Sequence, residues 1–238
     1  MLGDSGPDDT KDSAAPSTTA PAAPLRLVAW FASRRQRQLV GAAAGAGQLQ
    51  PVAAVDILAP ERLRELARTS LWLLLFSGTM FLVLDLIAWR VQHAGLLLGT
   101  VPWLGIVALV LGNIALYILM LAAHEAVHAA TILALGGRPR FGLRLPLAAY
   151  CTAPGQLFTR AGYVVVALAP LIVISLAGAV GIWLAPPLGA YLLFALAGNV
   201  SGAVGDLATV GELRALPSTA LIADNATGFT AYVMRALE

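Results

Sequence analysis

Long apolar stretches recur between residues 71 and 206 of this 238-residue chain. Four stretches are about as long as the ~20 apolar residues that a helix needs to cross a bilayer, at roughly 71–89, 101–135, 161–184 and 188–206. The second is longer than one crossing requires, so we expect its helix to tilt or to project beyond the bilayer. Residues 140–146 alternate apolar and polar side chains, which indicates a short extended strand. The pattern predicts an all-α membrane protein with about four transmembrane helices and a short β-hairpin between the second and third.

Two local signals mark helix ends. Pro60 followed by Glu61 is typical of a first helical turn. The N–H groups of this turn have no helical acceptor, so the N–H that proline lacks is not missed. The positive end of the helix dipole favours the carboxylate of Glu61. Gly136 and Gly137, followed by Pro139, are expected to end the second apolar helix.

The flanking segments differ from the apolar region in composition. Residues 1–24 consist largely of Pro, Ala, Ser, Thr and Asp, which bury too little apolar surface to fold, so a disordered tail is predicted. Residues 25–68 place seven arginines among apolar residues and predict a cytoplasmic, amphipathic juxtamembrane segment. Residues 69–214 then form the transmembrane core, and residues 215–238 form a cytoplasmic C-terminal tail.

Composition excludes several classes of protein. The chain is 58% hydrophobic and only 12% charged, with a mean hydropathy of +0.78. One soluble core cannot bury that much apolar surface, which excludes an ordinary soluble domain, a disordered protein and a nucleic-acid-binding module. Because Cys151 is the only cysteine, a disulfide framework is excluded as well.

The positive charges are distributed unevenly along the chain. Fourteen of the 15 Lys and Arg residues fall on one side of the four predicted crossings, and Arg90 falls on the other. Basic residues are retained on the cytoplasmic side of membranes. The sequence therefore predicts a multi-pass protein of the inner or plasma membrane, with both termini in the cytoplasm.

The second apolar stretch contains the motif His124-Glu125-Ala126-Val127-His128. A spacing of four residues puts both imidazoles on one helix face, where they can share one Zn²⁺, and Glu125 can take a proton from a metal-activated water. The alternative is two core histidines beside an incidental glutamate. Because ionisable groups inside a spanning helix are costly and usually functional, the zinc site is favoured.

A catalytic zinc needs a third protein ligand. His93 is the remaining histidine, but the predicted topology puts it on the opposite side of the membrane from the motif. Asp206, at the end of the fourth apolar stretch, falls at a matching depth and is the favoured ligand. Asp224 and Glu212 are the less favoured alternatives.

The chain resembles the zincin-peptidase family of bacterial membrane proteins, which is itself similar to site-2-protease-type intramembrane metalloproteases. The resemblance covers roughly residues 68–230 and rests on the order of four motifs, namely HEAVH, AYCTAPGQLFTRAGYVVVALAPLIVI, GNVSGAVGDL and PSTALIAD. It implies that His124, His128 and Asp206 hold zinc and that Glu125 is the general base. One departure is Val-Gly-Asp-Leu around Asp206, where site-2 proteases usually carry Asn-Pro-Asp-Gly or Leu-Asp-Gly. Asn199 is expected to hydrogen-bond a substrate carbonyl or an oxyanion.

These observations favour a zinc metallopeptidase of the HExxH type, with one zinc per chain, that cleaves peptide bonds within or next to membrane segments. The expected partners are a membrane protein or peptide substrate and the lipid bilayer, with no nucleic acid. A stripe of small residues, Gly198-x-x-x-Gly202 and Ser201-x-x-x-Gly205, suits helix packing or a homodimer. Three alternatives stay open: a non-catalytic zinc-binding scaffold, a metal-sensing or transport protein, and a peptidase of soluble peptides.

Overall fold

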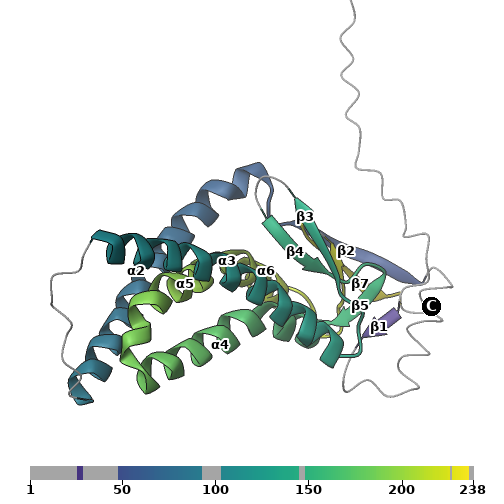
Figure 1. The fold of residues 1–238 in the computed structure, drawn as a ribbon. Coiled ribbons are helices and arrows are strands. Elements are labelled where there is room, and N and C mark those ends of the chain that lie inside the picture. The colour runs from purple at the N-terminus through teal and green to yellow at the C-terminus, as the bar shows by residue number, and fades with distance from the viewer. Residues whose placement is uncertain (1–25, 29–47, 93–102, 145–147, 226, 236–238) are drawn as a thin grey trace, which may run out of the picture.

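The structure is a computed structural model that describes residues 26–28, 48–92, 103–144, 148–225 and 227–235. The predicted disordered tail (1–24), residues 25 and 29–47 of the predicted juxtamembrane segment, and His93 lie outside these residues. Helices occupy one end of the described part of the chain and strands the other (Figure 1).

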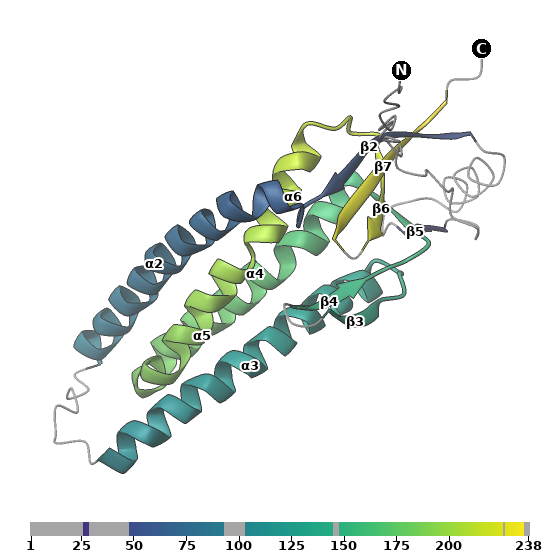
Figure 2. The same cartoon turned by 90° about the horizontal axis from the view of Figure 1, so that it is seen from above.

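The four apolar stretches form helices that are long and apolar enough to cross a membrane. The first three are α2 (Pro60–Val91), α3 (Trp103–Ala134) and α4 (Arg160–Leu184). The fourth consists of a 3-10 turn, η1 (Pro186–Leu188), and the helices α5 (Gly189–Gly202) and α6 (Val204–Arg214). Figure 2 shows the helices running side by side, with the strands gathered at one end.

The fourth helical segment differs from its prediction in two ways. It continues to Arg214 rather than ending near Asp206, and it is interrupted at Ala203, between α5 and α6. Asp206 consequently lies in the first turn of α6, where the helix dipole favours a carboxylate.

The predicted helix ends agree with the structure. Pro60 is the first residue of α2, and Glu61 lies in its first turn. After α3, Gly136 adopts a positive φ of 89°, which glycine reaches without steric cost. The N–H of Gly137 then bonds back to the carbonyl of Ile132, which closes the end of the helix.

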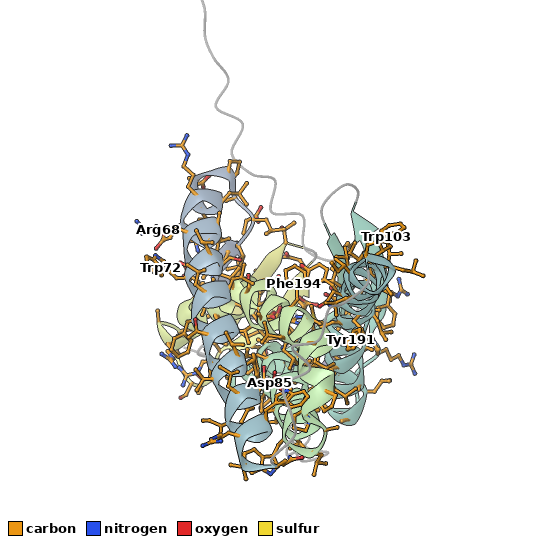
Figure 3. All side chains as sticks on the ribbon, turned by 60° about the vertical axis from the view of Figure 1, so that its left-hand side comes forward. Arg68, Trp72, Asp85, Trp103, Tyr191 and Phe194 are labelled. Carbon is orange, nitrogen blue, oxygen red and sulfur yellow. The ribbon has the colours of Figure 1, made fainter. Side chains whose placement is uncertain are left out.

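The outer faces of the helices carry large apolar side chains. Trp72 on α2 and Trp103 on α3 are 67% and 75% exposed, and Phe194 on α5 is 51% exposed (Figure 3). A soluble protein rarely exposes an apolar surface of this extent. The described helices therefore have the surface of a membrane protein.

A short hairpin follows α3, as the alternating residues predict. Strand β3 (Arg140–Arg144) pairs antiparallel with β4 (Ala148–Thr152), and Phe141 lies opposite Cys151. Among the described strands, β4 has β3 as its one partner.

The prediction of an otherwise all-α protein is wrong, because the structure also contains a five-stranded sheet in the order β1-β5-β6-β7-β2. Two of its strands lie in the segment predicted to be a C-terminal tail. The short strands of this sheet give weak sequence signals, and Pro51 interrupts the regular register of the longest one. The strands are β1 (Arg26–Val28), β2 (Leu49–Asp56), β5 (Gln156–Thr159), β6 (Leu221–Asn225) and β7 (Gly228–Met234).

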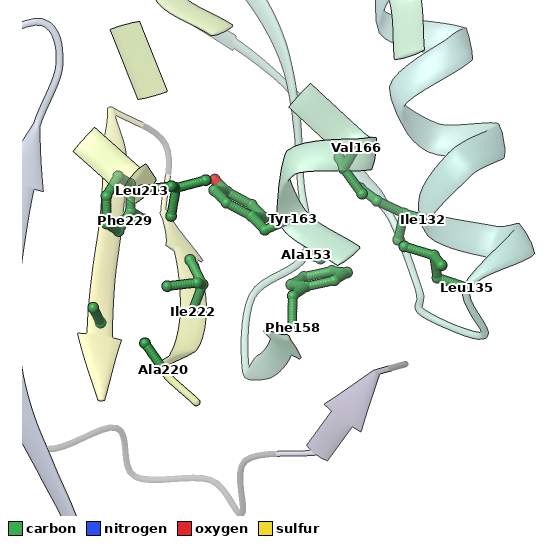
Figure 4. Packing of buried hydrophobic residues seen from close by; sticks show 11 residues of the cluster. Ile132, Leu135, Ala153, Phe158, Tyr163, Val166, Leu213, Ala220, Ile222 and Phe229 are labelled. Atoms are coloured by element: carbon green, nitrogen blue, oxygen red, sulfur yellow. The ribbon is translucent and has the colours of Figure 1, made fainter. Parts of the chain in front are cut away.

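A core of buried side chains joins this sheet to the adjacent helix ends. Phe158 of β5, Tyr163 of α4 and Phe229 of β7 form an aromatic cluster (Figure 4). The centroid of the Tyr163 ring lies 5.7 Å from that of Phe158 and 6.0 Å from that of Phe229. Ile132 of α3 and Leu213 of α6 pack against the same cluster. The sheet is therefore fastened to three of the four helical segments.

Truncating this core should cost stability. Phe229→Ala is expected to lower the free energy of unfolding by about 3–5 kcal/mol, because the ring is fully buried. The matched control Phe141→Ala removes a ring that is 66% exposed and should change stability by about 0.5 kcal/mol or less. Denaturant titration in detergent measures both, and equal losses would contradict the assigned core.

Candidate metal centre

Helix α3 presents both histidines of the HEAVH motif on one face. The rings of His124 and His128 lie with centroids 4.9 Å apart, as their four-residue spacing predicts. His128 is buried, and His124 is partly buried. Helix α3 therefore holds two imidazoles close together on one face.

Asp206 approaches these rings from α6. One carboxylate oxygen, Oδ2, lies 3.2 Å from Nε2 of His124, and the other, Oδ1, lies 3.5 Å from Nε2 of His128. One ligand atom from each of the three residues falls within 4.8 Å of the others. The three side chains that the sequence predicts as ligands are thus brought together from two separate elements.

The remaining ring nitrogens face oxygen acceptors. Nδ1 of His124 lies 3.0 Å from the amide oxygen of Asn199, and Nδ1 of His128 lies 2.9 Å from the carbonyl of Val166. Each Nδ1 therefore carries the proton in the neutral ring, which leaves the Nε2 lone pair aimed at the shared site. Metal-ligating histidines use this arrangement, so the donor set fits a zinc ion.

A cavity of about 250 Å³ opens beside the cluster. Glu125 lines it together with both histidines and Asp206, so a general base and the candidate ligands share one space. Tyr150 and Cys151 of β4 also line it, as do residues of the loop before α2 and of the turn between β6 and β7. The hairpin and the sheet thus line the same cavity into which the helices place the candidate ligands.

Cys151 lines the cavity as an inert group. Burial, assisted by the nearby carboxylates of Glu125 and Asp224, raises the pKa of its thiol to about 11. The thiol is therefore protonated at neutral pH, which makes it a poor nucleophile and a poor metal ligand.

The structure gives the two alternative ligands other partners. Asp224 accepts hydrogen bonds from the Tyr163 hydroxyl at 2.7 Å and from the Ala153 backbone N–H at 2.8 Å. Burial raises the pKa of the Asp224 carboxyl, although these hydrogen bonds lower it in part. Glu212 forms an ion pair of 2.6 Å with Arg62 and lies away from the cavity.

Asn199 is almost fully buried, with 1% of its surface exposed. Its amide nitrogen lies 3.4 Å from the Pro170 carbonyl and 3.4 Å from the Ser175 hydroxyl, and its oxygen faces His124. These contacts identify Asn199 as a partner of a candidate ligand. Its predicted contact with a substrate oxygen is untested and stays a prediction.

Three of these partners were missed at the level of sequence. Tyr163 and Ala153 gave no signal, because they reach Asp224 through the fold and not through spacing. Val166 did have a signal, since it lies four residues before a proline inside a helix. Such a proline leaves the carbonyl four residues earlier without its helical donor.

The stripe of small residues is used inside this chain. Ser201 shares a hydrogen bond of 2.8 Å with Ser70 of α2. A Cβ added at Gly198 would lie 2.4 Å from the ring of Tyr117 on α3, so only glycine allows this approach. The stripe brings α5 against both α2 and α3, and thereby places Asn199 beside His124.

Comparison with known proteins supports the same chemistry. Residues 117–221 match the family described as "Putative zincin peptidase". The matched segment contains the HEAVH motif, Asn199 and Asp206, and it ends before Asp224. No curated protein and no solved structure shows significant similarity to the chain. The family match therefore agrees with a zinc peptidase site built from the residues that the structure brings together.

Proposed function

We propose that this protein is a membrane-embedded zinc metallopeptidase that hydrolyses peptide bonds within or next to membrane segments, with Glu125 as the general base. The observation that carries the proposal is the convergence of His124, His128 and Asp206 beside Glu125 in one cavity. The four apolar helices and the zincin match support the membrane setting and the reaction class.

The residues of the site have different roles in the proposed reaction. His124, His128 and Asp206 would hold the zinc, which supplies Lewis acidity and lowers the pKa of a water in the site. Glu125 takes the proton from the attacking water and returns it to the leaving amine of the cleaved peptide. Asn199 and Val166 hold the two imidazoles in the required tautomer.

In the described part of the chain, one edge of β4 has no strand partner, which suits an extended peptide. Strand β4 pairs with β3 among the described strands, and Tyr150 and Cys151 place it at the wall of the cavity. A peptide that adds to this edge by main-chain hydrogen bonds would pass beside Glu125. We propose this route for the substrate.

We also propose that both termini lie in the cytoplasm, from the charge distribution described above. Fusing a reporter that is active only outside the cytoplasm should give signal at position 97 and none at position 238. Fusions of a cytoplasmic reporter at the same sites serve as the control and should give the opposite pattern. Signal from the first reporter at position 238 would reverse the proposed orientation.

The third ligand can be tested by exchanging either aspartate. Asp206→Asn is expected to reduce zinc from about one ion per chain to nearly none after dialysis against a chelator, because a ligand is lost. Asp224→Asn should retain zinc but lower the free energy of unfolding by about 1–3 kcal/mol, because the two donors bond to different carboxylate oxygens and asparagine replaces one of these with an NH2 group.

Metal analysis and thermal denaturation of the two variants distinguish these outcomes. Zinc loss in the Asp224 variant together with zinc retention in the Asp206 variant would reverse the ligand assignment.

The general base is tested by Glu125→Gln, which keeps the size of the side chain. Zinc content should stay at the wild-type level, while the rate of peptide hydrolysis should fall by about 10²–10⁴-fold, because no carboxylate takes the proton. Glu212→Gln is the matched control, since Glu212 lies outside the cavity, and it should retain activity.

Cleavage by Glu125→Gln at the wild-type rate would contradict this mechanism. A cellular phenotype that wild type and Glu125→Gln restore equally would instead favour a zinc-binding scaffold or a metal-sensing or transport protein.

A further inference from the structure

Helix α4 contains a proline in its interior, at Pro170. In an α-helix each N–H donates to the carbonyl four residues earlier. Proline has no N–H, so the carbonyl of Val166 has no helical donor at residue 170. Because both residues are buried, that carbonyl requires a donor from elsewhere in the protein.

The donor to this carbonyl is a candidate metal ligand. Nδ1 of His128 lies 2.9 Å from the oxygen of Val166, in a contact that is buried. In a helix without the proline, the N–H of residue 170 would compete for the same oxygen. The gap in the hydrogen-bond ladder of α4 is therefore the place where His128 is oriented.

The same turn of α4 also reaches the other histidine. The carbonyl of Pro170 lies 3.4 Å from the amide nitrogen of Asn199, whose oxygen lies 3.0 Å from Nδ1 of His124. Donation by the amide nitrogen fixes which end of the Asn199 side chain faces His124. Both imidazoles are thus held, directly or through Asn199, by consecutive parts of one helix.

We propose that Pro170 is a positioning residue, which frees the Val166 carbonyl to orient His128 and braces Asn199 against His124. This inference rests on the proposed zinc site, but it does not require that the protein be a peptidase. It assigns the effect of the proline on His128 to the missing N–H, not to the bulk of the ring or to a change in helix direction. The contact with Asn199 uses the carbonyl of residue 170.

The missing N–H and the ring can be separated by two substitutions at one position. Pro170→Ala removes the ring and restores an N–H that can donate to Val166. An ester variant, in which lactic acid replaces Pro170 by nonsense suppression, removes the ring but restores no N–H. The two variants have the same side chain and differ in a single backbone group.

Zinc affinity by chelator competition is the first readout. Pro170→Ala is expected to bind zinc about 10–100-fold more weakly than wild type, the loss typical of a disrupted ligand partner. The ester variant should stay within about threefold of wild type, because the Val166 carbonyl remains available to His128. Equal weakening in both variants, or wild-type affinity in both, would overturn the proposal.

A spectroscopic readout separates positioning from a general loss of structure. The visible spectrum of the Co²⁺-substituted protein should change in Pro170→Ala and match wild type in the ester variant, while circular dichroism shows equal helix content. A Co²⁺ spectrum of Pro170→Ala identical to wild type would overturn the proposal.

A second variant keeps the proposal testable if Pro170→Ala does not fold. Replacing Ala167 by lactic acid turns the carbonyl of Val166 into an ester carbonyl, which is a weaker acceptor, and keeps the side chain of residue 167 unchanged. Zinc binding should weaken by about 2–10-fold. Unchanged affinity in this variant would show that the Val166 carbonyl does not orient His128.

The outcomes also distinguish this inference from the proposed function. Wild-type protein that binds no zinc would refute the metal site itself. Wild-type protein that binds zinc but cleaves no peptide would refute the peptidase, and the affinities of the variants would still decide the role of Pro170.

Discussion

A histidine inside an apolar helix needs a polar partner for each of its two ring nitrogens, and the arrangement of the site follows from that constraint. His124 and His128 turn Nε2 toward Asp206, so each Nδ1–H needs an oxygen on the far side of the ring. Helices α4 and α5 supply those oxygens from Val166 and Asn199. The close approach of α5 to α3 at Gly198 is required to bring the Asn199 oxygen to His124.

The strands complete the site from outside the apolar helices. The sheet packs on the ends of α3, α4 and α6 through one buried cluster, and its residues wall the cavity. Asp224 connects the two layers, because it accepts hydrogen bonds from Tyr163 of α4 and from the backbone after β4. The hairpin that borders Glu125 is therefore held in place by a carboxylate from near the end of the chain.

Much of the helical part was predictable because its signals are long or regular. Apolar stretches of about twenty residues identified all four helical segments, and the four-residue spacing of His124 and His128 placed both rings on one face. Asp206 was predictable from its depth in the fourth stretch, although its place in a new helix was not.

The sheet was not predicted, because strands of three to eight residues give few periods to detect and their pairing joins distant segments. Strand β7 does alternate, with Phe229 and Ala231 buried, yet only its partners decide that it belongs to a sheet. The same reason explains Asp224, whose hydrogen bonds to Tyr163 and Ala153 cross 61 and 71 residues of sequence. Hydrogen-bond partners of this kind are set by tertiary packing and leave no local pattern.

The distance along the chain between the ligands sets an order of events during synthesis. His124 precedes Asp206 by 82 residues, a length that a ribosome adds in about 4–16 s. Throughout that interval the histidines already exist, but the Asp206 carboxylate and the strands β6 and β7 do not. The set of three candidate ligands can therefore be completed only after Asp206 has been added, long after both histidines have been synthesised.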